Sequence, residues 1–270
     1  MPEAPDLEAY ATYLSPRMMG HKVKEAKALI PAVVKAGKEL LPALASQTVL
    51  TVKRTGKFLQ IDTQGAIVAI HPMLTGRFHY LPQTERRRPR TVWALTLDDG
   101  MELRLWDERL LSRIYVAPDK EALQSILPSR PDTGPDALSP QLTPQLVKER
   151  LQGQKAAIKS LILSEKLVSG IGNAYADEVL WAAGISPFRR GQDLQDHEVE
   201  ALTRAIREVI TNGARQVLAM MERYGLPDDE YREHMAVHRR GDQPCPRCHT
   251  PIQESASGGR VTSYCPSCQK

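Results

Sequence analysis

The sequence predicts an α+β protein with more than one domain, in which a β-rich N-terminal part precedes a helical part and a small cysteine-containing module. Three observations support this prediction. Short β-rich runs separated by turns extend to about residue 117, helical periodicity dominates the second half, and all four cysteines lie after residue 244. The chain has 270 residues, a length that suits two domains and a small appendage better than a single domain.

The N-terminal part begins with the pattern of a helix that packs along one face. Four apolar residues recur at helical spacing: Leu7, Tyr10, Leu14 and Met18. From about residue 21 to 117 the sequence instead contains short β-rich runs, such as VLTVKRTGKFLQIDT and TVWALTLDDGMELRLW, with Gly, Asp-Gly or polar turns between them. A leading helix and a β-rich unit predict a sandwich or half-barrel with the helix laid against it. We assign residues 1–128 to this domain.

A segment rich in proline and small polar residues follows, and we interpret residues 129–141 as an interdomain linker. The composition then turns helical, with a long helix expected from about Asp196 to Tyr224. The apolar residues of this helix have the spacing of a core-facing stripe: Val199, Leu202, Ile206, Val209 and Ile210. We assign residues 142–235 to a helical domain.

The C-terminal segment contains two Cys-x-x-Cys pairs, Cys245 with Cys248 and Cys265 with Cys268. Two such turns at this separation place four thiolates around one tetrahedral zinc ion. Because a site closed by four thiolates leaves no open position, the zinc is expected to be structural. The sequence therefore predicts a zinc ribbon at 236–270, with one Zn²⁺ and no other cofactor.

A glycine-rich junction joins two of the expected helices, in the sequence Ser-Gly-Ile-Gly-Asn-Ala-Tyr that begins at Ser169. Gly170 and Gly172 permit a sharp turn and the close approach of another backbone. The helix that follows offers unpaired N–H groups at its start, and Asn173 is placed to cap this helix or to contact a phosphate. Glycines also occur in helix–helix turns for steric reasons alone, so both interpretations stay open at this point.

The formal net charge of +4 does not by itself identify a partner. Basic residues nevertheless gather in local clusters, which are what a polyanion-binding face requires, although solvated surface loops are the alternative. The clusters lie at 53–57, 86–90, 189–190 and 239–240. The sequence has no apolar run of the length that a membrane span needs and no signal-peptide pattern at its start, so we expect a cytoplasmic protein.

Six segments in a characteristic order carry a resemblance to a known family. They are MPEAPDLE, RTGKFL, HPMLTG, WDERLLS, KAAIKSLILSEKLVSGIGNAYADEVLWAAGISP, and HRRGDQPCPRC with GGRVTSYCPSCQ. Together they span nearly the whole chain, and their order and spacing are similar to those of the Fpg/Nei family, the formamidopyrimidine and endonuclease VIII DNA glycosylases. The resemblance implies an N-terminal β-sandwich, a helix–two-turn–helix domain and a zinc ribbon. It also implies a monomeric, nucleoid-associated enzyme that binds damaged duplex DNA.

The resemblance further implies a bifunctional glycosylase and AP lyase. Removal of Met1 would expose Pro2 as a secondary amine, which attacks C1′ of a damaged nucleotide, expels the base and forms an iminium intermediate. By the same resemblance, Glu3 is the proton shuttle. Lys57 matches the family's hairpin lysine, which contacts phosphate and assists as an acid. Strand cleavage then follows by β- and δ-elimination.

DNA-handling residues are also implied by the matching motifs. Extruding a damaged base from the duplex costs free energy, which side chains that fill the gap partly offset. The family's pattern assigns the gap-filling wedge to Leu74, the contact with the orphaned base to Arg109, and packing beside that arginine to Leu111. It assigns phosphate contacts flanking the lesion to Asn173 and Arg260. Further backbone contacts match three residues on the helical segments: Lys155, Lys159 and Tyr175.

The sequence departs from the family pattern at positions that bear on specificity. Asp6 stands where many relatives have Glu, and Leu74 and Leu111 replace the usual Met and Phe. The residues from Gly213 onward continue into an apparent helix, where relatives specific for 8-oxoguanine usually have a loop rich in Ser, Thr and Gly. The apparent absence of this loop favours an endonuclease VIII-like or divergent specificity over 8-oxoguanine.

Two alternatives from other classes remain. One is a non-catalytic protein that binds damaged DNA on the same scaffold, and the other is a zinc-ribbon nucleic-acid-binding protein without enzymatic lineage. The joint presence of Pro2, Glu3 and Lys57 favours the enzyme, because binding alone requires neither a terminal amine nor the glutamate.

Overall fold

The computed structural model describes residues 1–128 and 133–270, so the first four residues of the expected linker lie outside the described residues. Its contacts divide the chain into two compact units. The first contains the chain up to residue 128 together with Ala214–Tyr231, and the second contains residues 133–213 and 232–270. The domain limits inferred from the sequence stay predictions. They do not coincide with the two units, because residues 214–231, which the sequence assigns to the helical domain, group with the N-terminal unit.

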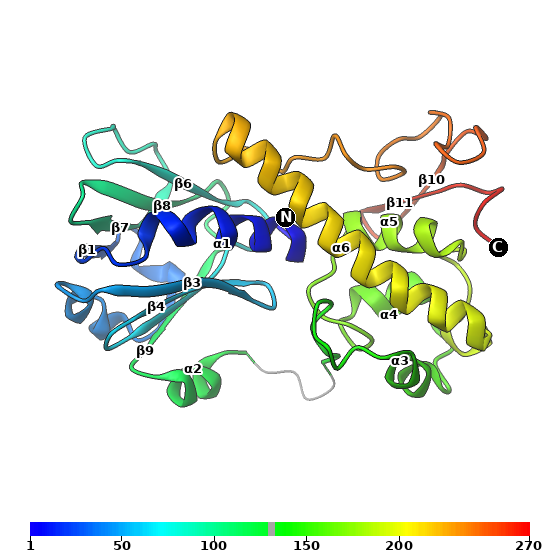
Figure 1. Ribbon diagram of the computed structural model, residues 1–270, viewed down its shortest axis with the longest axis horizontal. Coiled ribbons are helices and arrows are strands. Elements are labelled where there is room, and N and C mark those ends of the chain that lie inside the picture. The colour runs from blue at the N-terminus through cyan, green and yellow to red at the C-terminus, as the bar shows by residue number, and fades with distance from the viewer. Residues whose placement is uncertain (129–132) are drawn as a thin grey trace. The chain divides into compact units, whose positions relative to one another are not determined.

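Two sheets form the first unit (Figure 1). One has four strands in the order β1 (Val23–Ala28), β7 (Thr91–Leu97), β8 (Met101–Asp107) and β6 (Gly76–Pro82). The other has five strands in the order β2 (Val34–Ala36), β9 (Arg113–Ala117), β5 (Ile67–His71), β4 (Phe58–Thr63) and β3 (Val49–Thr55). All pairings are antiparallel except β2 with β9.

A hydrophobic core joins the two sheets. Phe78, Trp93 and Leu105 of the four-stranded sheet belong to the same buried cluster as Ile61 and Ile70 of the five-stranded sheet. Inward-facing apolar residues from two sheets therefore interdigitate, as in a β-sandwich. The expected N-terminal β-sandwich is confirmed, and the half-barrel is not what forms.

The leading helix α1 (Ala4–Met18) packs on this core. All four residues of the predicted apolar face are fully buried: Leu7, Tyr10, Leu14 and Met18. The helix begins with a capping box, in which Asp6 accepts a hydrogen bond from the Glu3 backbone N–H at 2.7 Å and Glu3 accepts one from that of Asp6. The start of this helix is thus determined by its own first residues.

Short elements complete the connections of the first unit. They are the 3₁₀ turns Pro31–Val33, Lys38–Leu40 and Pro42–Leu44, and the helix α2 (Lys120–Ile126). Asp119 caps the start of α2, because its side chain accepts a hydrogen bond from the backbone N–H of Ala122 at 2.8 Å.

The second unit is mainly helical. Its elements are α3 (Pro144–Leu151), α4 (Ile158–Leu163), α5 (Asn173–Ala183), the 3₁₀ turn Gly191–Asp193, and the first part of α6 (Asp196–Tyr224). The observed limits of α6 confirm the predicted helix. This helix continues without a break through Gly213 into the residues that belong to the first unit. Within the described residues, no helix is both long enough and apolar enough to cross a membrane.

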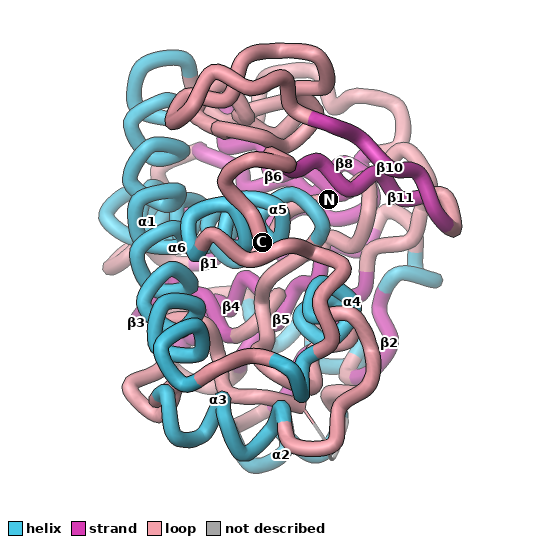
Figure 2. The backbone as a smooth tube through the Cα atoms, turned by 90° about the vertical axis from the view of Figure 1, so that its right-hand side faces the viewer, coloured by secondary structure: helices cyan, strands magenta, loops and turns pink. Residues whose placement is uncertain are grey.

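A two-stranded hairpin closes the C-terminal part, formed by β10 (Gln253–Ser257) and β11 (Arg260–Tyr264), as Figure 2 shows. Gly258 and Gly259 form its two-residue turn, and both have positive φ angles, of 56° and 75°. This conformation strongly favours glycine, and it produces the tight turn that a hairpin needs. Arg260 lies directly after the turn and is exposed.

Candidate active site and nucleic-acid interface

The start of the chain forms a buried, polar corner of the first unit. Pro2 is buried, and Glu3 directly after it is 3 % exposed. The capping box holds the Glu3 backbone at the first turn of α1, because Asp6 bonds to its N–H. Asp6, which departs from the family pattern, is itself only 2 % exposed. The structure thus brings Pro2, Glu3 and Asp6 together at one helix terminus.

An acidic segment, residues 225–231, follows α6 in the first unit and contacts this corner. The amino group of Met1 lies 2.7 Å from Oε1 of Glu230, and Arg77 Nη2 of β6 lies 2.9 Å from the same oxygen. Arg77 is 5 % exposed and also donates to the backbone carbonyl of Asp228. No local motif links residue 77 to residue 230, so the sequence alone gives no signal for this contact.

A cavity of about 320 Å³ lies beside this segment. It is lined by Thr75, Arg77, Arg88, Trp106, Glu108, Asp228 and Asp229. Asp228 receives hydrogen bonds from Arg88 at 2.5 Å and from His79 at 3.0 Å. The hydrogen bond from Arg88 is the main reason that the pKa of the Asp228 carboxyl is lowered. Burial lowers the pKa of His79. The cavity wall is therefore polar and internally paired.

Lys57 lies on the two-residue turn between β3 and β4. Gly56 precedes it with φ of 58°, a conformation that favours glycine. Arg54 braces this hairpin, because its Nε donates to Glu8 of α1 at 2.8 Å and its Nη1 donates to the Gly56 carbonyl at 2.9 Å. The hairpin that carries Lys57 is therefore tied to the helix that carries Glu3.

The two loops that carry the expected wedge residues lie together in the first unit. Leu74 lies in the turn between β5 and β6 and is 43 % exposed, and Arg109 lies exposed in the loop between β8 and β9. Asp107 connects the two loops. It accepts hydrogen bonds from the Thr75 hydroxyl at 2.5 Å and from the Arg109 backbone N–H at 3.2 Å.

The same loop gives its two leucines different exposures. Leu111 is half-buried, whereas Leu110 is 42 % exposed and has a positive φ angle. Within the described part of the loop, Leu110 is thus the more exposed apolar side chain beside Arg109. The assignment of Leu111 by resemblance stays a prediction.

The glycine-rich junction lies in the second unit, between α4 and α5. Gly170 has φ of 93° and Gly172 is the N-terminal cap of α5. Asn173 Nδ2 donates to the backbone carbonyl of Val261 in β11 at 2.9 Å. The junction is therefore joined to the strand that begins at Arg260, so the two expected phosphate contacts, Asn173 and Arg260, are held by one local structure.

Lys159 does not have the surface position expected for a phosphate contact. Its side chain is 6 % exposed and lies 2.6 Å from Asp177 Oδ1, and it also donates to Thr262 of β11 at 2.9 Å. Asp177 is also within 2.7 Å of His238 Nδ1. A buried lysine is stable only when its charge is paired, and Asp177 provides that pairing here. Since Lys159 also donates to Thr262 of β11, it supports the hairpin from inside the unit.

Tyr175 and Lys155 were also expected to contact DNA, and they differ from each other in exposure. Tyr175 is 1 % exposed and its hydroxyl lies 3.0 Å from Nε2 of His234, so its ring packs inside the unit. A Cβ on Gly213 of α6 would lie 2.6 Å from this ring, so that glycine permits the close packing. Lys155 lies exposed in the loop before α4. Of these two expected DNA contacts, only Lys155 is on the surface.

Several residues of the basic clusters form ion pairs with carboxylates of the chain. Lys53 contacts Asp62 at 2.5 Å, Arg87 contacts Glu102 at 2.5 Å, and Arg189 contacts Glu198 at 2.7 Å. Part of the positive charge of the clusters at 53–57, 86–90 and 189–190 is therefore balanced by carboxylates of the same chain.

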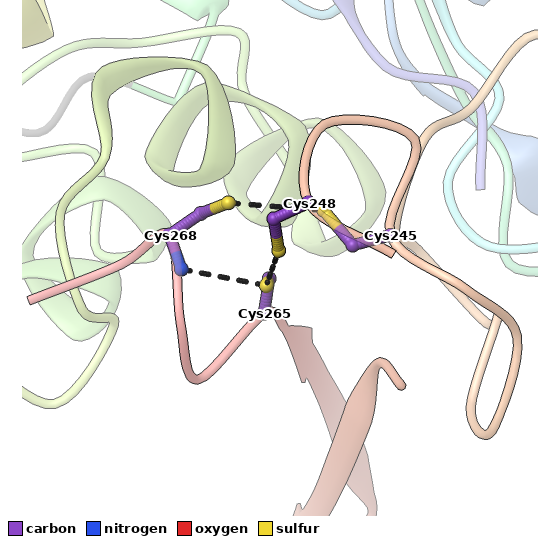
Figure 3. A group of neighbouring side chains, drawn as sticks. All are labelled: Cys245, Cys248, Cys265 and Cys268. Atoms are coloured by element: carbon purple, nitrogen blue, oxygen red, sulfur yellow. Dashed lines mark hydrogen bonds between the residues drawn. The ribbon is translucent and has the colours of Figure 1, made fainter. Parts of the chain in front are cut away.

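The four cysteines converge at the base of the β10–β11 hairpin (Figure 3). Their sulfur atoms all lie within 4.8 Å of one another, with Cys245 to Cys268 at 3.9 Å and Cys248 to Cys265 at 3.4 Å. Tetrahedral zinc with Zn–S bonds of about 2.3 Å requires sulfur atoms about 3.8 Å apart. The donor set and its spacing therefore fit one zinc ion.

The pKa values of these thiols are shifted in opposite directions. The Thr250 hydroxyl is the main cause that lowers the pKa of Cys248 to about 6, whereas burial raises that of Cys268 to about 12. Four negative sulfurs this close repel one another unless a cation lies among them. Trp181 of α5 donates to the Cys245 sulfur at 3.4 Å, so the site is also attached to the helical part of its unit.

Comparisons with known proteins agree with this geometry. Residues 1–114 match the family model of the formamidopyrimidine-DNA glycosylase N-terminal domain, residues 133–221 the H2TH domain of formamidopyrimidine-DNA glycosylase, and residues 242–270 a zinc finger found in FPG and IleRS.

Known proteins are similar to this chain over its whole length. The chain is 32% identical to the formamidopyrimidine-DNA glycosylase of Pelotomaculum thermopropionicum, over all of this chain and 99% of that protein. It is 34% identical to that of Symbiobacterium thermophilum, over all of this chain and 89% of that protein. A solved structure of a Lactococcus lactis FPG mutant with Fapy-dG containing DNA has a TM-score of 0.88 at 25% identity, with full coverage of both chains.

The sandwich, the helix–two-turn–helix junction and the four-thiolate ribbon together define a zinc-ribbon DNA glycosylase. The whole-length matches are specific enough to name the family. The chain belongs to the formamidopyrimidine-DNA glycosylase family of base-excision repair enzymes with AP lyase activity.

Proposed function

We propose that this enzyme uses Pro2 as its nucleophile after Met1 is removed. The nitrogen lone pair of Pro2 attacks C1′, the bond from C1′ to the damaged base breaks, and the base leaves with a proton. The nitrogen then loses its own proton, the C1′–O4′ bond of the sugar opens, O4′ takes up a proton, and the nitrogen forms a double bond to C1′. The resulting iminium acidifies the C2′ proton, and β- and then δ-elimination cut the strand. The observation that best supports this proposal is the position of Pro2, buried directly before Glu3 at the capped start of α1.

Glu3 is proposed as the group that moves protons at the sugar, because its carboxyl is buried next to Pro2. Lys57 is proposed to contact phosphate and to assist as an acid. Its hairpin is short and is braced on α1 through Arg54 and Glu8, which supports a defined position for its ammonium group. A general acid is effective only when its position relative to the reacting atoms is restricted.

The proposed substrate is damaged duplex DNA, bound by a cytoplasmic, nucleoid-associated monomer with one structural Zn²⁺ and no other cofactor. Leu74, Arg109 and Leu111 are proposed to fill the gap left by the extruded nucleotide, and the exposure of the first two is compatible with this role. Asn173 and Arg260 are proposed to bind the phosphates beside the lesion, with Lys155 as an outer contact. The internal position of Tyr175 supports only an indirect contribution.

We also propose a lesion preference for ring-opened purines, oxidised pyrimidines and abasic sites over 8-oxoguanine. The residues from Gly213 to Tyr224 belong to α6, which leaves only the short acidic segment 225–231 where a closing loop would have to form. Arg77, His79 and Arg88 hold this segment on the sandwich. Complexes with Fapy-dG and with an oxidised pyrimidine are recorded for the Lactococcus lactis protein.

The test is borohydride trapping with protein whose Met1 removal is confirmed by mass. Matched duplexes would carry an abasic site, 8-oxoguanine, a ring-opened purine or an oxidised pyrimidine. We expect a trapped adduct on the abasic duplex that disappears in Pro2→Gly, and weaker cleavage of 8-oxoguanine than of the other two base lesions. An absence of adduct on every duplex contradicts the proline mechanism and supports a non-catalytic DNA-binding protein. Preferential cleavage of 8-oxoguanine contradicts the proposed specificity alone.

A further inference from the structure

The contact between the chain's amino terminus and the acidic segment 225–231 carries a further inference. The Met1 amino group and the Arg77 guanidinium both lie on Oε1 of Glu230, at 2.7 and 2.9 Å. The Glu230 side chain is 15 % exposed, so this carboxylate is largely withdrawn from water. A carboxylate in such a position interacts more strongly with a nearby cation than an exposed one does.

We propose that Glu230 is the carboxylate that binds the Pro2 amine in the processed enzyme and stabilises the positive charge on its nitrogen during the reaction. This inference rests on the proposed function, since it assigns a partner to the proline nucleophile. It adds a residue that lies far from the N-terminal motif in sequence.

The distance follows from covalent geometry. Three bonds join the nitrogen of Met1 to that of Pro2, so the two nitrogens are roughly 3–4 Å apart. Glu230 Oε1 therefore lies no more than about 6–7 Å from the Pro2 nitrogen before any side-chain movement. Removal of Met1 also vacates the space between them, and a glutamate side chain has three rotatable bonds with which to close it.

The charge of the nitrogen changes in a way that a fixed carboxylate can exploit. The nitrogen is positive in the resting ammonium, neutral when it attacks C1′, and positive again in the iminium. A carboxylate beside it stabilises both cations. Removal of the carboxylate should therefore shift the acidic limb of the pH profile of the trapping rate to lower pH. It should also slow iminium formation at high pH.

Other ionisable groups face the same corner. Glu3 and Asp6 project from α1 with the neutral Tyr10, whose pKa is raised by burial, while Arg77 comes from β6. Asp6 is engaged in the capping box. The guanidinium of Arg77 balances part of the negative charge, so Glu230 is one member of a set and the expected shift is moderate.

Arg77 does not depend on Glu230 alone. It also donates to the carbonyls of Gly76 and Asp228 and lies 3.4 Å from the carboxylate of Asp229. Asp229 is in the same segment, contacts the same arginine, and has a side chain that is 96 % exposed. Asp229→Asn is therefore a matched control, which removes one charge from the segment at a position that makes no contact with the amino terminus among the described ion pairs.

The experiment measures the rate of borohydride trapping on an abasic duplex between pH 5 and 9 for wild type, Glu230→Gln, Glu230→Asp and Asp229→Asn, each with Met1 removal confirmed by mass. We expect Glu230→Gln to shift the acidic limb down by about one pH unit and to lower the high-pH rate about tenfold. Asp229→Asn should match wild type, and Glu230→Asp, which keeps the charge, should retain the wild-type limb.

The outcomes are separable. A Glu230→Gln protein with a lower melting temperature but an unchanged pH profile overturns the inference and leaves Glu230 as a structural partner of Arg77. An equal shift in Asp229→Asn also overturns it, because the effect would then belong to the charge of the segment as a whole. If Glu230→Gln does not fold, Glu230→Asp provides the test. The inference is overturned if the acidic limb of the Glu230→Asp pH profile shifts to lower pH by as much as loss of the carboxylate is expected to cause. If processed wild type gives no adduct, the proline mechanism itself has failed.

Discussion

The hydroxyl of Thr75 and the carboxylate of Asp107 form a 2.5 Å hydrogen bond that joins the loop carrying Leu74 to the loop carrying Arg109. Asp107 is fully buried, and its second oxygen accepts from both the backbone N–H and the hydroxyl of Ser112, at 2.6 and 2.7 Å. Burial raises the pKa of Asp107, but these hydrogen bonds outweigh it and the net pKa is lowered. One charged side chain thus holds two loops that are more than thirty residues apart in sequence.

Replacing Asp107 should therefore damage both stability and damaged-base excision. We expect Asp107→Ala to lower the free energy of unfolding by about 2–3 kcal/mol, because buried donors lose their shared acceptor. Excision of a damaged base should fall more than cleavage at a preformed abasic site, since the wedge and the arginine lose their common support. Thermal melts and nicking assays measure the two effects. Thr75→Val, which removes one donor, should cost about 1 kcal/mol, and an unaltered melting temperature in Asp107→Ala would refute the idea.

A second buried carboxylate predicts how stability depends on pH. Burial raises the pKa of Glu102, but hydrogen bonds from Arg87, Arg104 and Thr96 outweigh it and lower the pKa to about 2. An unfolded glutamate titrates near pH 4.3. Because the folded pKa is the lower one, the stabilisation is present above about pH 4.3 and is lost as the pH falls towards 2.

Melting temperatures measured from pH 7 to 2 should therefore fall steeply below about pH 4.5. Glu102→Gln should flatten this acidic decline and should cost about 3 kcal/mol at pH 7, because buried Arg104 loses its partner. Glu121→Gln on exposed α2 is the control. If the melting temperature of Glu102→Gln falls with pH as steeply as that of wild type, Glu102 is not the source of the acidic decline in stability.

Removal of zinc should unfold the ribbon and spare the sandwich. A four-thiolate site contributes folding free energy directly, and the ribbon's small core contains two of the cysteines together with Val237 and Ile252. We expect about one zinc per chain by metal analysis, and Cys265→Ser or chelation should abolish zinc and tight DNA binding. The near-UV signal of Trp93, buried in the sandwich, should persist. Loss of the sandwich signal together with the metal would show that the units do not fold separately.

The hairpin arginine gives a prediction about salt. If Arg260 binds one phosphate, Arg260→Ala should weaken binding to every duplex sequence and reduce the slope of log affinity against log salt by about one. Arg204→Ala, on the exposed face of α6, should leave that slope unchanged. Filter-binding or anisotropy titrations over several salt concentrations measure it. An unchanged slope in Arg260→Ala would remove this residue from the phosphate contacts.

The support beneath that hairpin could not be read from the sequence. Lys159 occupies a segment that matches a DNA-binding helix, so a surface role was the natural expectation. Its burial depends on Asp177 and on Thr262 of β11, more than a hundred residues away. No spacing rule connects these positions, because the pairing arises only when the helices and the ribbon pack.

Local spacing by itself determined several features of this protein. The apolar stripe and capping residues of α1, the unbroken α6, and the four zinc-binding thiols are encoded within short stretches, since helical periodicity and the Cys-x-x-Cys turn act over a few residues. The whole-length order of motifs was sufficient to place the chain in its family.

Only the tertiary structure decided the strand order β1-β7-β8-β6, the link through Asp107, the internal position of Tyr175, and the contact of Glu230 with the amino terminus. The physical reason is that these features are long-range. Each joins groups that become neighbours only when sheet register and core packing bring them together, and the free energy of a buried charge depends on that environment more than on residue type.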